Sequence, residues 1–222
     1  MGEPSEEVVW QPSLLSAAEP VGIDVTFSSI ERLQLDDESW ADHVVGWVTG
    51  ADRLFADVLA SRDWGQRSRH MYDRTVLEPR LTSSWNLESG APLDPPILEE
   101  IRTALSGRYD RVFDSVGFNL YRDGNDSVAW HGDRIRKEIA DPVVALVCLG
   151  EPRRFLLRPK GGGGSRAVLL GGGDLFVMGG RSQRTWEHSV PKVAKAGPRI
   201  SIAYRHGLDP RVYAGKRTEP RP

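Results

Sequence analysis

The stretch "VGFNLYRDGNDSVAWHGD", residues 116–133, has the pattern of a β-hairpin. Two segments with apolar and β-prone residues flank a run of Gly, Asn and Asp that is typical of a tight turn. The second segment ends on His131 and Asp133, which are two residues apart and therefore project to the same side of a strand. The hairpin is thus predicted to carry an imidazole and a carboxylate side by side at one end.

The chain around this hairpin predicts an α+β fold. Apolar runs separated by Gly, Asp, Asn and Pro predict strands at residues 115–122, 127–131, 142–149, 153–158, 166–170, 174–178, 185–190 and 198–205. Upstream, helical spacing of apolar residues predicts two amphipathic helices at residues 50–62 and 94–107, the second with Asp94 as its N-cap and Gly107 as its C-cap. We expect a double-stranded β-helix, or jelly-roll, core with supporting N-terminal helices.

Length and composition indicate one domain. The chain has 222 residues, 39% of them hydrophobic, which suffices for one sizeable core. We expect an acidic, partly flexible arm at residues 1–20 and a single domain at residues 21–222. Because neither a long apolar run nor a basic-then-apolar leader is visible, a cytoplasmic protein without a membrane partner is expected. The only cysteine, Cys148, lies in an apolar run and is expected to be a buried thiol.

Charge is unevenly distributed. Residues 1–60 hold 2 basic and 12 acidic side chains, whereas residues 61–222 hold 27 and 19. A basic catalytic portion suits a polyanionic partner, although a solvated surface of mixed charge accounts for the same counts. The glycine clusters at 161–164 and 171–173 are not followed by a Lys-Ser/Thr pair, so turns are expected there and a phosphate-binding loop is not.

His131 and Asp133 could share a metal ion with a histidine from a distant strand, for which His188 is the candidate. Two imidazoles and one carboxylate leave positions open, as non-haem Fe(II) requires to bind a chelating co-substrate and dioxygen. Zinc could use the same ligands, and His131 could equally be an ordinary strand histidine.

Two arginines favour the iron interpretation. The far carboxylate of a 2-oxo acid needs a cation, and Arg199 and Arg205 lie six residues apart on one face of a predicted strand. Asn119 and Tyr121 alternate in the same way on the strand before the turn and could complete a polar pocket. Each residue has an ordinary structural explanation, but together they favour a co-substrate site.

The order and spacing of these residues resemble the AlkB family of Fe(II)- and 2-oxoglutarate-dependent alkylation-repair dioxygenases. The family pattern of N-x-Y, H-x-D, a distant H and two arginines is present as Asn119, Tyr121, His131, Asp133, His188, Arg199 and Arg205. The resemblance covers residues 60–206, including "EPRLTSSW" (residues 78–85), which is similar to the substrate-side segment of members that repair duplex DNA.

The resemblance implies roles for these residues. The Fe(II) ligands would be His131, Asp133 and His188. The residues around 2-oxoglutarate would be Asn119, Tyr121, Arg199, Ser201 and Arg205, with Arg199 on the far carboxylate and Ser201 where several members have asparagine. With O2 as the second co-substrate, the protein would oxidatively demethylate N-alkylated bases in DNA, its expected partner, and would act as a monomer.

The substrate side follows from the same resemblance. A base alkylated on its Watson–Crick edge must leave the stack before oxidation, so an aromatic shelf is expected. The candidate substrate contacts are Trp85, Tyr72, Arg80 and Ile135, the last standing where some members place an acidic residue against the base. Trp130 should point away from His131 and lie in the core.

Two alternatives remain at this level. The same chemistry could act on RNA, a protein or a lipid, because the metal and co-substrate pattern does not specify what binds above the iron. A damaged-DNA-binding protein with weak or lost oxygenase activity would keep the fold, although it would have no need for an iron-facing carboxylate.

Overall fold

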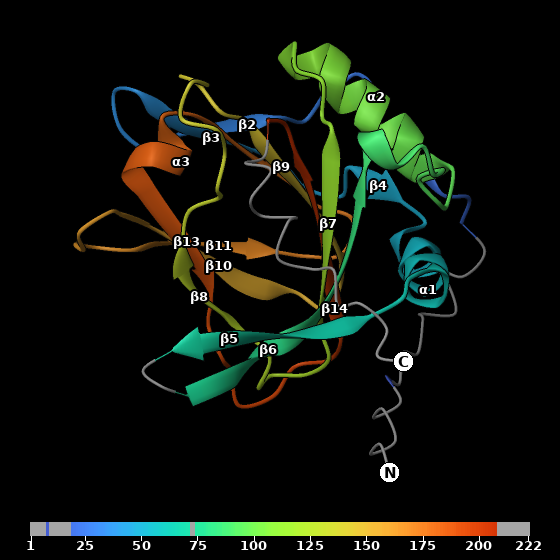
Figure 1. Ribbon diagram of the computed structural model, residues 1–222. Helices are drawn as coiled ribbons and strands as arrows, with labels where there is room; N and C mark the ends of the chain where they lie inside the picture. The colour runs from blue at the N-terminus through green and yellow to red at the C-terminus, as the bar shows by residue number, and fades with distance from the viewer. Residues whose placement is uncertain (1–7, 9–18, 72–73, 208–222) are drawn as a thin grey trace.

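The computed structural model describes residue 8 and residues 19–71 and 74–207, so most of the expected arm at residues 1–20 lies outside the described residues. All strand pairs are antiparallel and form two main sheets (Figure 1). The larger sheet has the order β2 (Glu31–Gln34), β3 (Ser39–Val44), β12 (Leu175–Gly180), β9 (Val144–Gly150), β14 (Arg199–Arg205), β7 (Ser115–Tyr121), β6 (Arg74–Asn86) and β5 (Gly65–Met71). The smaller sheet has the order β11 (Arg166–Leu170), β10 (Arg153–Pro159), β13 (Trp186–Val190) and β8 (Val128–His131). Short strands β1 (Gly22–Ile23) and β4 (Val48–Thr49) pair separately.

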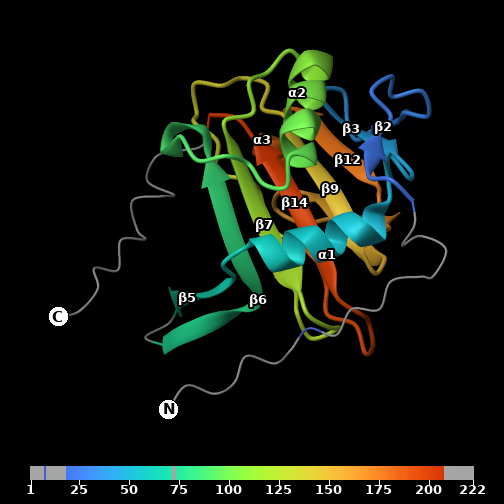
Figure 2. The same ribbon diagram turned by 90° about the vertical axis from the view of Figure 1, so that its right-hand side faces the viewer.

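Helices cover the outer face of the larger sheet, as Figure 2 shows for α1 (Ala51–Ser61) and α2 (Ile97–Tyr109). Their apolar faces pack on side chains of β7, β9 and β14 and form a helix-side core that includes Leu54, Ile101 and Phe118, all 0% exposed. A short helix α3 (Ser182–Thr185) precedes β13, and a 3-10 turn η1 (Leu87–Ser89) follows β6. Within the described ranges, no helix is long and apolar enough to cross a bilayer.

A second core lies between the two sheets. Side chains of β9, β10 and β12 meet there, among them Leu146, Phe155 and Phe176. Strand β9, "VALVCLG", is buried along its whole length, because one of its faces contacts the helix-side core and the other this inter-sheet core. That double burial explains its continuous apolar sequence.

The eight strands predicted from residue 115 onward are confirmed, and the structure shows the jelly-roll core that the pattern indicated. The strands β1 to β6, which lie in the first half together with the two predicted helices, were not predicted. Strand β2 is exposed throughout, and the buried positions Glu78, Arg80 and Thr82 of the long β6 are polar. Neither sequence therefore shows the apolar-polar alternation that identifies a half-buried strand.

Both predicted helices are present, but the caps of the second were wrong. Helix α2 begins after Pro96 and continues through Gly107 to Tyr109. Asp110, in a left-handed conformation with φ 50°, ends it and donates its backbone N–H to the Ser106 carbonyl. Apolar contacts of the last turn therefore outweigh the preference of glycine for a helix end.

Trp85 is not a base-stacking residue in this structure, which corrects the sequence-based expectation. It pairs with Val116 of β7 and lies in the helix-side core, 7% exposed, with its indole N–H donated to the Ala91 carbonyl at 2.8 Å. Arg80 and Thr82 of the same strand have the opposite parity and face the other side. The indole and the metal-ligand candidates are therefore on opposite sides of the sheet.

We predict that Trp85→Ala lowers the free energy of unfolding by about 3–5 kcal/mol, because it removes a large core side chain. Urea unfolding monitored by circular dichroism measures this loss, and Val112→Ala, at a position 65% exposed, should change stability by less than about 0.5 kcal/mol. Wild-type stability combined with weaker oligonucleotide binding in Trp85→Ala would instead support stacking.

Candidate metal and co-substrate site

Pairing of β8 with β13 brings the two candidate histidines together. His131 and His188 are direct partners across the strands, and their ring centroids are 4.3 Å apart. The ring of Phe155 from β10 stacks on His188 at 5.2 Å and limits its movement. The structure therefore places side by side two residues that are 57 positions apart in the chain.

Asp133 joins the histidines immediately after β8. Its Oδ1 accepts a hydrogen bond from Arg205 Nε at 2.6 Å, and its backbone N–H donates to Gln183 Oε1 at 3.0 Å. Its Oδ2 is buried, has no hydrogen-bond partner among the described residues, and lies 3.9 Å from His188 Nε2. A buried carboxylate oxygen left unpaired in this way is suited to a cation.

The local electrostatics keep these groups in the protonation states of metal ligands. Burial lowers the pKa of His188 to about 3 and also lowers that of His131, so both imidazoles are neutral near pH 7. Burial alone would raise the pKa of Asp133, but Arg205 and the two histidines outweigh it and lower the value to about 2. His131 Nδ1 donates to the Ala129 carbonyl at 2.8 Å, which leaves the lone pair on Nε2.

The donor set fits a divalent iron ion. Among the residues that the structure describes, no three His, Cys, Asp or Glu side chains are placed so that together they could hold a metal ion without moving. Two neutral imidazoles and an ionised carboxylate with one unpaired oxygen nevertheless match the facial set that Fe(II) uses. His131, Asp133 and His188 are therefore the residues that would hold it.

The predicted co-substrate residues share the inner face of the larger sheet. The register of β7 with β14 places Tyr121 opposite Arg199 and Asn119 opposite Ser201. Asn119 Oδ1 accepts a hydrogen bond from Arg80 Nε at 3.1 Å. Arg205, by contrast, contacts Asp133, so it acts on the candidate metal site.

Arg199 is a buried cation without an acidic partner. It is 1% exposed, and its Nη2 donates to Cys148 Sγ at 3.0 Å. Its Nε and Nη1 have no hydrogen-bond partner in residues 19–71 or 74–207, and no ion pair with a described carboxylate is formed. Because a buried guanidinium without a counter-ion is costly, this position suits the carboxylate of a ligand.

Cys148 is buried and unoxidised, as expected, but its position beside Arg199 was not foreseen. Burial raises the pKa of its thiol, so the sulfur is uncharged and leaves the charge of Arg199 uncompensated. The apolar run that contains Cys148 gave no sign of this contact, since the contact depends on the register of β9 with β14.

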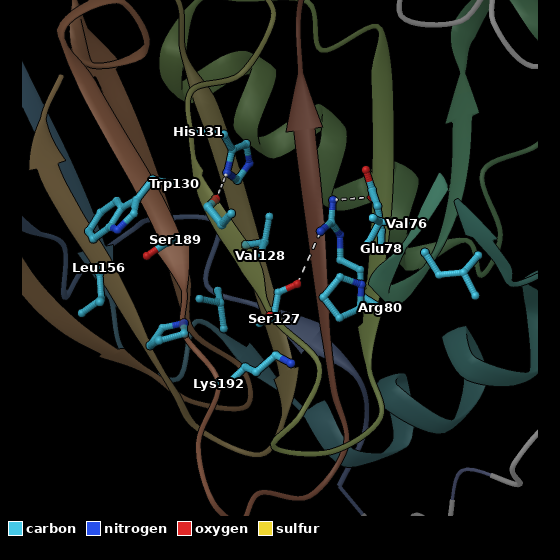
Figure 3. Close-up of a pocket in the computed structure, with 15 residues that line it drawn as sticks. Val76, Glu78, Arg80, Ser127, Val128, Trp130, His131, Leu156, Ser189 and Lys192 are labelled. Carbon is cyan, nitrogen blue, oxygen red and sulfur yellow. Dashed lines mark hydrogen bonds and ion pairs between the residues drawn. The ribbon is translucent and has the colours of Figure 1, made fainter. Parts of the chain in front are cut away.

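A groove of about 360 Å³ opens beside His131 (Figure 3). One wall is the β6 segment from Val76 to Arg80, and the other includes Val128 and Trp130 of β8 and Lys192 after β13. Arg80 is 8% exposed and forms an ion pair with Glu78 at 2.9 Å. Of the three predicted substrate contacts that the structure describes, Arg80 is the one that lines this groove.

The remaining predicted contacts are placed differently. Ile135 is 4% exposed in the inter-sheet core and does not line the groove, so its predicted contact with a base is wrong. Tyr72 lies outside the described residues. Trp130, expected in the core, is half-buried on the outer face of β8, where the guanidinium of Arg158 covers its ring at 4.1 Å.

A protein-family model confirms what this geometry indicates. The model of the 2OG-Fe(II) oxygenase superfamily matches residues 89–205, which is more than half of the chain and includes every candidate metal and co-substrate residue. The chain belongs to the 2OG-Fe(II) oxygenase superfamily.

Curated relatives of this oxygenase are AlkB homologues. The chain is 31% identical over 175 residues to the Bos taurus alpha-ketoglutarate-dependent dioxygenase alkB homolog 3, which covers 70% of this chain and 61% of the relative. It is 29% identical over 231 residues to the Arabidopsis thaliana DNA oxidative demethylase ALKBH2, and the match covers 89% of this chain and 72% of that relative. The chain thus spans less than two thirds of the alkB homolog 3 proteins that it matches.

Solved structures support the same fold. The structure of OsALKBH1 superposes with a TM-score of 0.56 at 15% identity, covering 79% of this chain and 99% of that chain. A 2OG-Fe(II) oxygenase family oxidoreductase from Burkholderia pseudomallei superposes with a TM-score of 0.52 at 13% identity. The match covers 80% of this chain and 84% of that chain.

We predict that Gly117→Ala weakens metal binding by this oxygenase. A Cβ at Gly117 would lie 2.6 Å from Arg205 Nη1, so the guanidinium would have to shift, and we expect the shift to disturb the hydrogen bond of its Nε to Asp133. Calorimetric titration with Mn(II), as a redox-stable substitute for Fe(II), should show at least about tenfold weaker binding, equivalent to about 1.4 kcal/mol.

Gly107→Ala in α2 is the matched control, because no atom lies within 4 Å of the Cβ that it would add. Unchanged Mn(II) affinity in Gly117→Ala would show that the contact of Arg205 with Asp133 does not organise the metal ligands.

Proposed function

We propose that the protein is an Fe(II)- and 2-oxoglutarate-dependent dioxygenase that oxidatively demethylates N-alkylated bases in DNA. The observation that carries this proposal is the unpaired Oδ2 of Asp133 beside two neutral histidines, in the same barrel as the buried, unpaired Arg199. Superfamily membership supports the reaction class, and relatives named DNA oxidative demethylase support the substrate class.

The iron would supply the oxidative chemistry. With 2-oxoglutarate and O2 as co-substrates, this chemistry would convert an N-alkylated base to the unmodified base and an aldehyde, with succinate and carbon dioxide as the other products. The protein contributes ligands, orientation and a site from which bulk water is excluded.

The side chains of this protein perform those tasks from fixed positions. Arg199 would bind the far carboxylate of 2-oxoglutarate through its two unpaired N–H groups, and burial at 1% exposure strengthens that ion pair. Arg205 and Gln183 orient Asp133 through its Oδ1 and its backbone N–H. Because His131 and His188 remain neutral, no proton has to leave before they bind metal.

The groove beside His131 is the proposed path for the damaged base. Its volume of about 360 Å³ lies within the usual range for small-ligand pockets, and His131 forms part of its lining. A base in a duplex cannot reach a buried metal site, so it would have to swing out of the stack to enter. Among the described residues of the lining, Lys192 and Arg80 are the two cations, and Glu78 is the one acid and is paired with Arg80.

Succinate release under Fe(II), ascorbate and oxygen tests the proposed function. A single-stranded DNA oligonucleotide carrying 1-methyladenine should stimulate succinate release and yield formaldehyde, whereas the unmethylated strand should not. Stronger stimulation by the same sequence as RNA would move the substrate class to RNA. No succinate with any substrate would contradict the oxygenase and favour a damage-binding protein.

We predict that His131→Ala lowers the rate of succinate release by at least about 100-fold, because it removes one of the three proposed iron ligands while leaving the cores intact. The variant should retain the wild-type circular dichroism spectrum. The control variant is His43→Gln, at a histidine of β3 that is not a metal-ligand candidate and whose Nε2 lies 3.3 Å from Asp174 Oδ2. This variant should retain activity. Wild-type turnover in His131→Ala would disprove the ligand assignment.

A further inference from the structure

Arg153 on β10 is a second buried cation that the assigned pattern of metal and co-substrate residues leaves out. It is 2% exposed, and its guanidinium donates only to backbone carbonyls. Nη1 donates to the Asp123 carbonyl at 3.0 Å, and Nη2 donates to the carbonyls of Asp126 at 3.1 Å and Pro191 at 2.7 Å. Its Nε has no hydrogen-bond partner among the residues described.

Arg153 and Arg199 lie against the same aromatic ring. The guanidinium carbons are 5.9 Å and 5.3 Å from the centroid of Tyr121. Burial lowers the pKa of Arg153, and the positive charge of Arg199 lowers it further, so the two cations interact through a protein interior. Two buried guanidinium groups against one ring repel each other, and an anion between or beside them would relieve this repulsion.

The carboxylates of Asp123 and Asp126 only partly offset the charge of this pair, and neither forms an ion pair with either arginine among the described residues. Asp126 is bound by Arg122 at 2.8 Å, and Asp123 accepts hydrogen bonds from the backbone and side chain of Asn125. Both acids are on the turn between β7 and β8, and only their backbone carbonyls contact Arg153. The described residues around Tyr121 therefore carry an excess of positive charge that Asp123 and Asp126 offset only in part.

We propose that Arg153 is a positioning residue that selects a dicarboxylate co-substrate, by adding a second positive charge beside the far carboxylate held by Arg199. This inference rests on the proposed function, because it concerns the same 2-oxoglutarate site. The three carbonyl contacts hold the guanidinium in place, and its charge acts on the ligand through Tyr121 and without a direct contact. Burial also raises the pKa of Tyr121, so its hydroxyl remains a proton donor for a carboxylate.

The consequence is discrimination between 2-oxo acids that differ at the far end only. 2-Oxopentanoate has the same chain length as 2-oxoglutarate and the same chelating group, but it lacks the far carboxylate. A residue that acts on the far carboxylate changes the affinity for 2-oxoglutarate and leaves that for 2-oxopentanoate unchanged. A residue that only stabilises the fold changes both.

Calorimetric titration of the full chain loaded with Mn(II) provides a measurement independent of turnover. Arg153→Gln keeps N–H donors for the carbonyls but removes the charge. It should lower the affinity for 2-oxoglutarate about tenfold or more, and change the affinity for 2-oxopentanoate less than about threefold. Arg153→Lys keeps the charge and should remain within about threefold of the wild type for both acids. Arg154→Gln, exposed on the next position of β10, is the matched control and should change neither.

Several results would overturn the inference. Equal weakening of both acids in Arg153→Gln, without rescue by Arg153→Lys, would give Arg153 a purely structural role. Undiminished preference for 2-oxoglutarate in Arg153→Gln would show that Arg199 suffices. If the wild type itself binds 2-oxoglutarate no better than 2-oxopentanoate, the proposed function fails together with this inference. Loss of preference in Arg153→Gln alone supports the inference.

Discussion

The site depends on the register of β14 between β7 and β9. With Arg199 opposite Tyr121, the odd-numbered residues Arg199, Ser201 and Arg205 face the barrel interior, while Ile200 and Ile202 face the helix-side core. A slip of one residue would bury the arginines among the helices and expose the isoleucines to the polar interior. The apolar packing of the helices therefore determines where the co-substrate cations lie.

The buried charged groups inside the barrel differ in whether they have a partner of opposite charge. Arg205 is neutralised by Asp133, whereas Arg199 and Arg153 have no carboxylate of their own in the described part of the chain. On the metal side, the second oxygen of Asp133 is likewise unpaired. Such groups cost stability in an isolated protein, and bound ions would remove that cost. Ligand binding at the metal side and at the co-substrate side would therefore be favoured, because it would pair charges that are unpaired in the isolated protein.

The groove beside His131 shares β8 and β13 with the metal-ligand candidates and takes its other wall from β6. The groove lies between β6 and the β8 edge of the smaller sheet, so its shape depends on a strand that contributes no metal ligand. Trp130, covered by Arg158, and the Arg80–Glu78 ion pair form parts of opposite walls. The shape of the groove can therefore differ among related oxygenases while the histidines and aspartate remain unchanged.

The sequence by itself determined the eight core strands, the two helices and the grouping of His131 with Asp133, because these follow from local alternation and helical spacing. It also indicated the family, through the order of a few polar residues. Only the tertiary structure placed Trp85 and Ile135 in apolar cores, and only it brought Cys148 and Arg153 beside the co-substrate residues. Alternation shows which residues share a face, whereas the neighbour of that face depends on pairing between strands far apart in the chain.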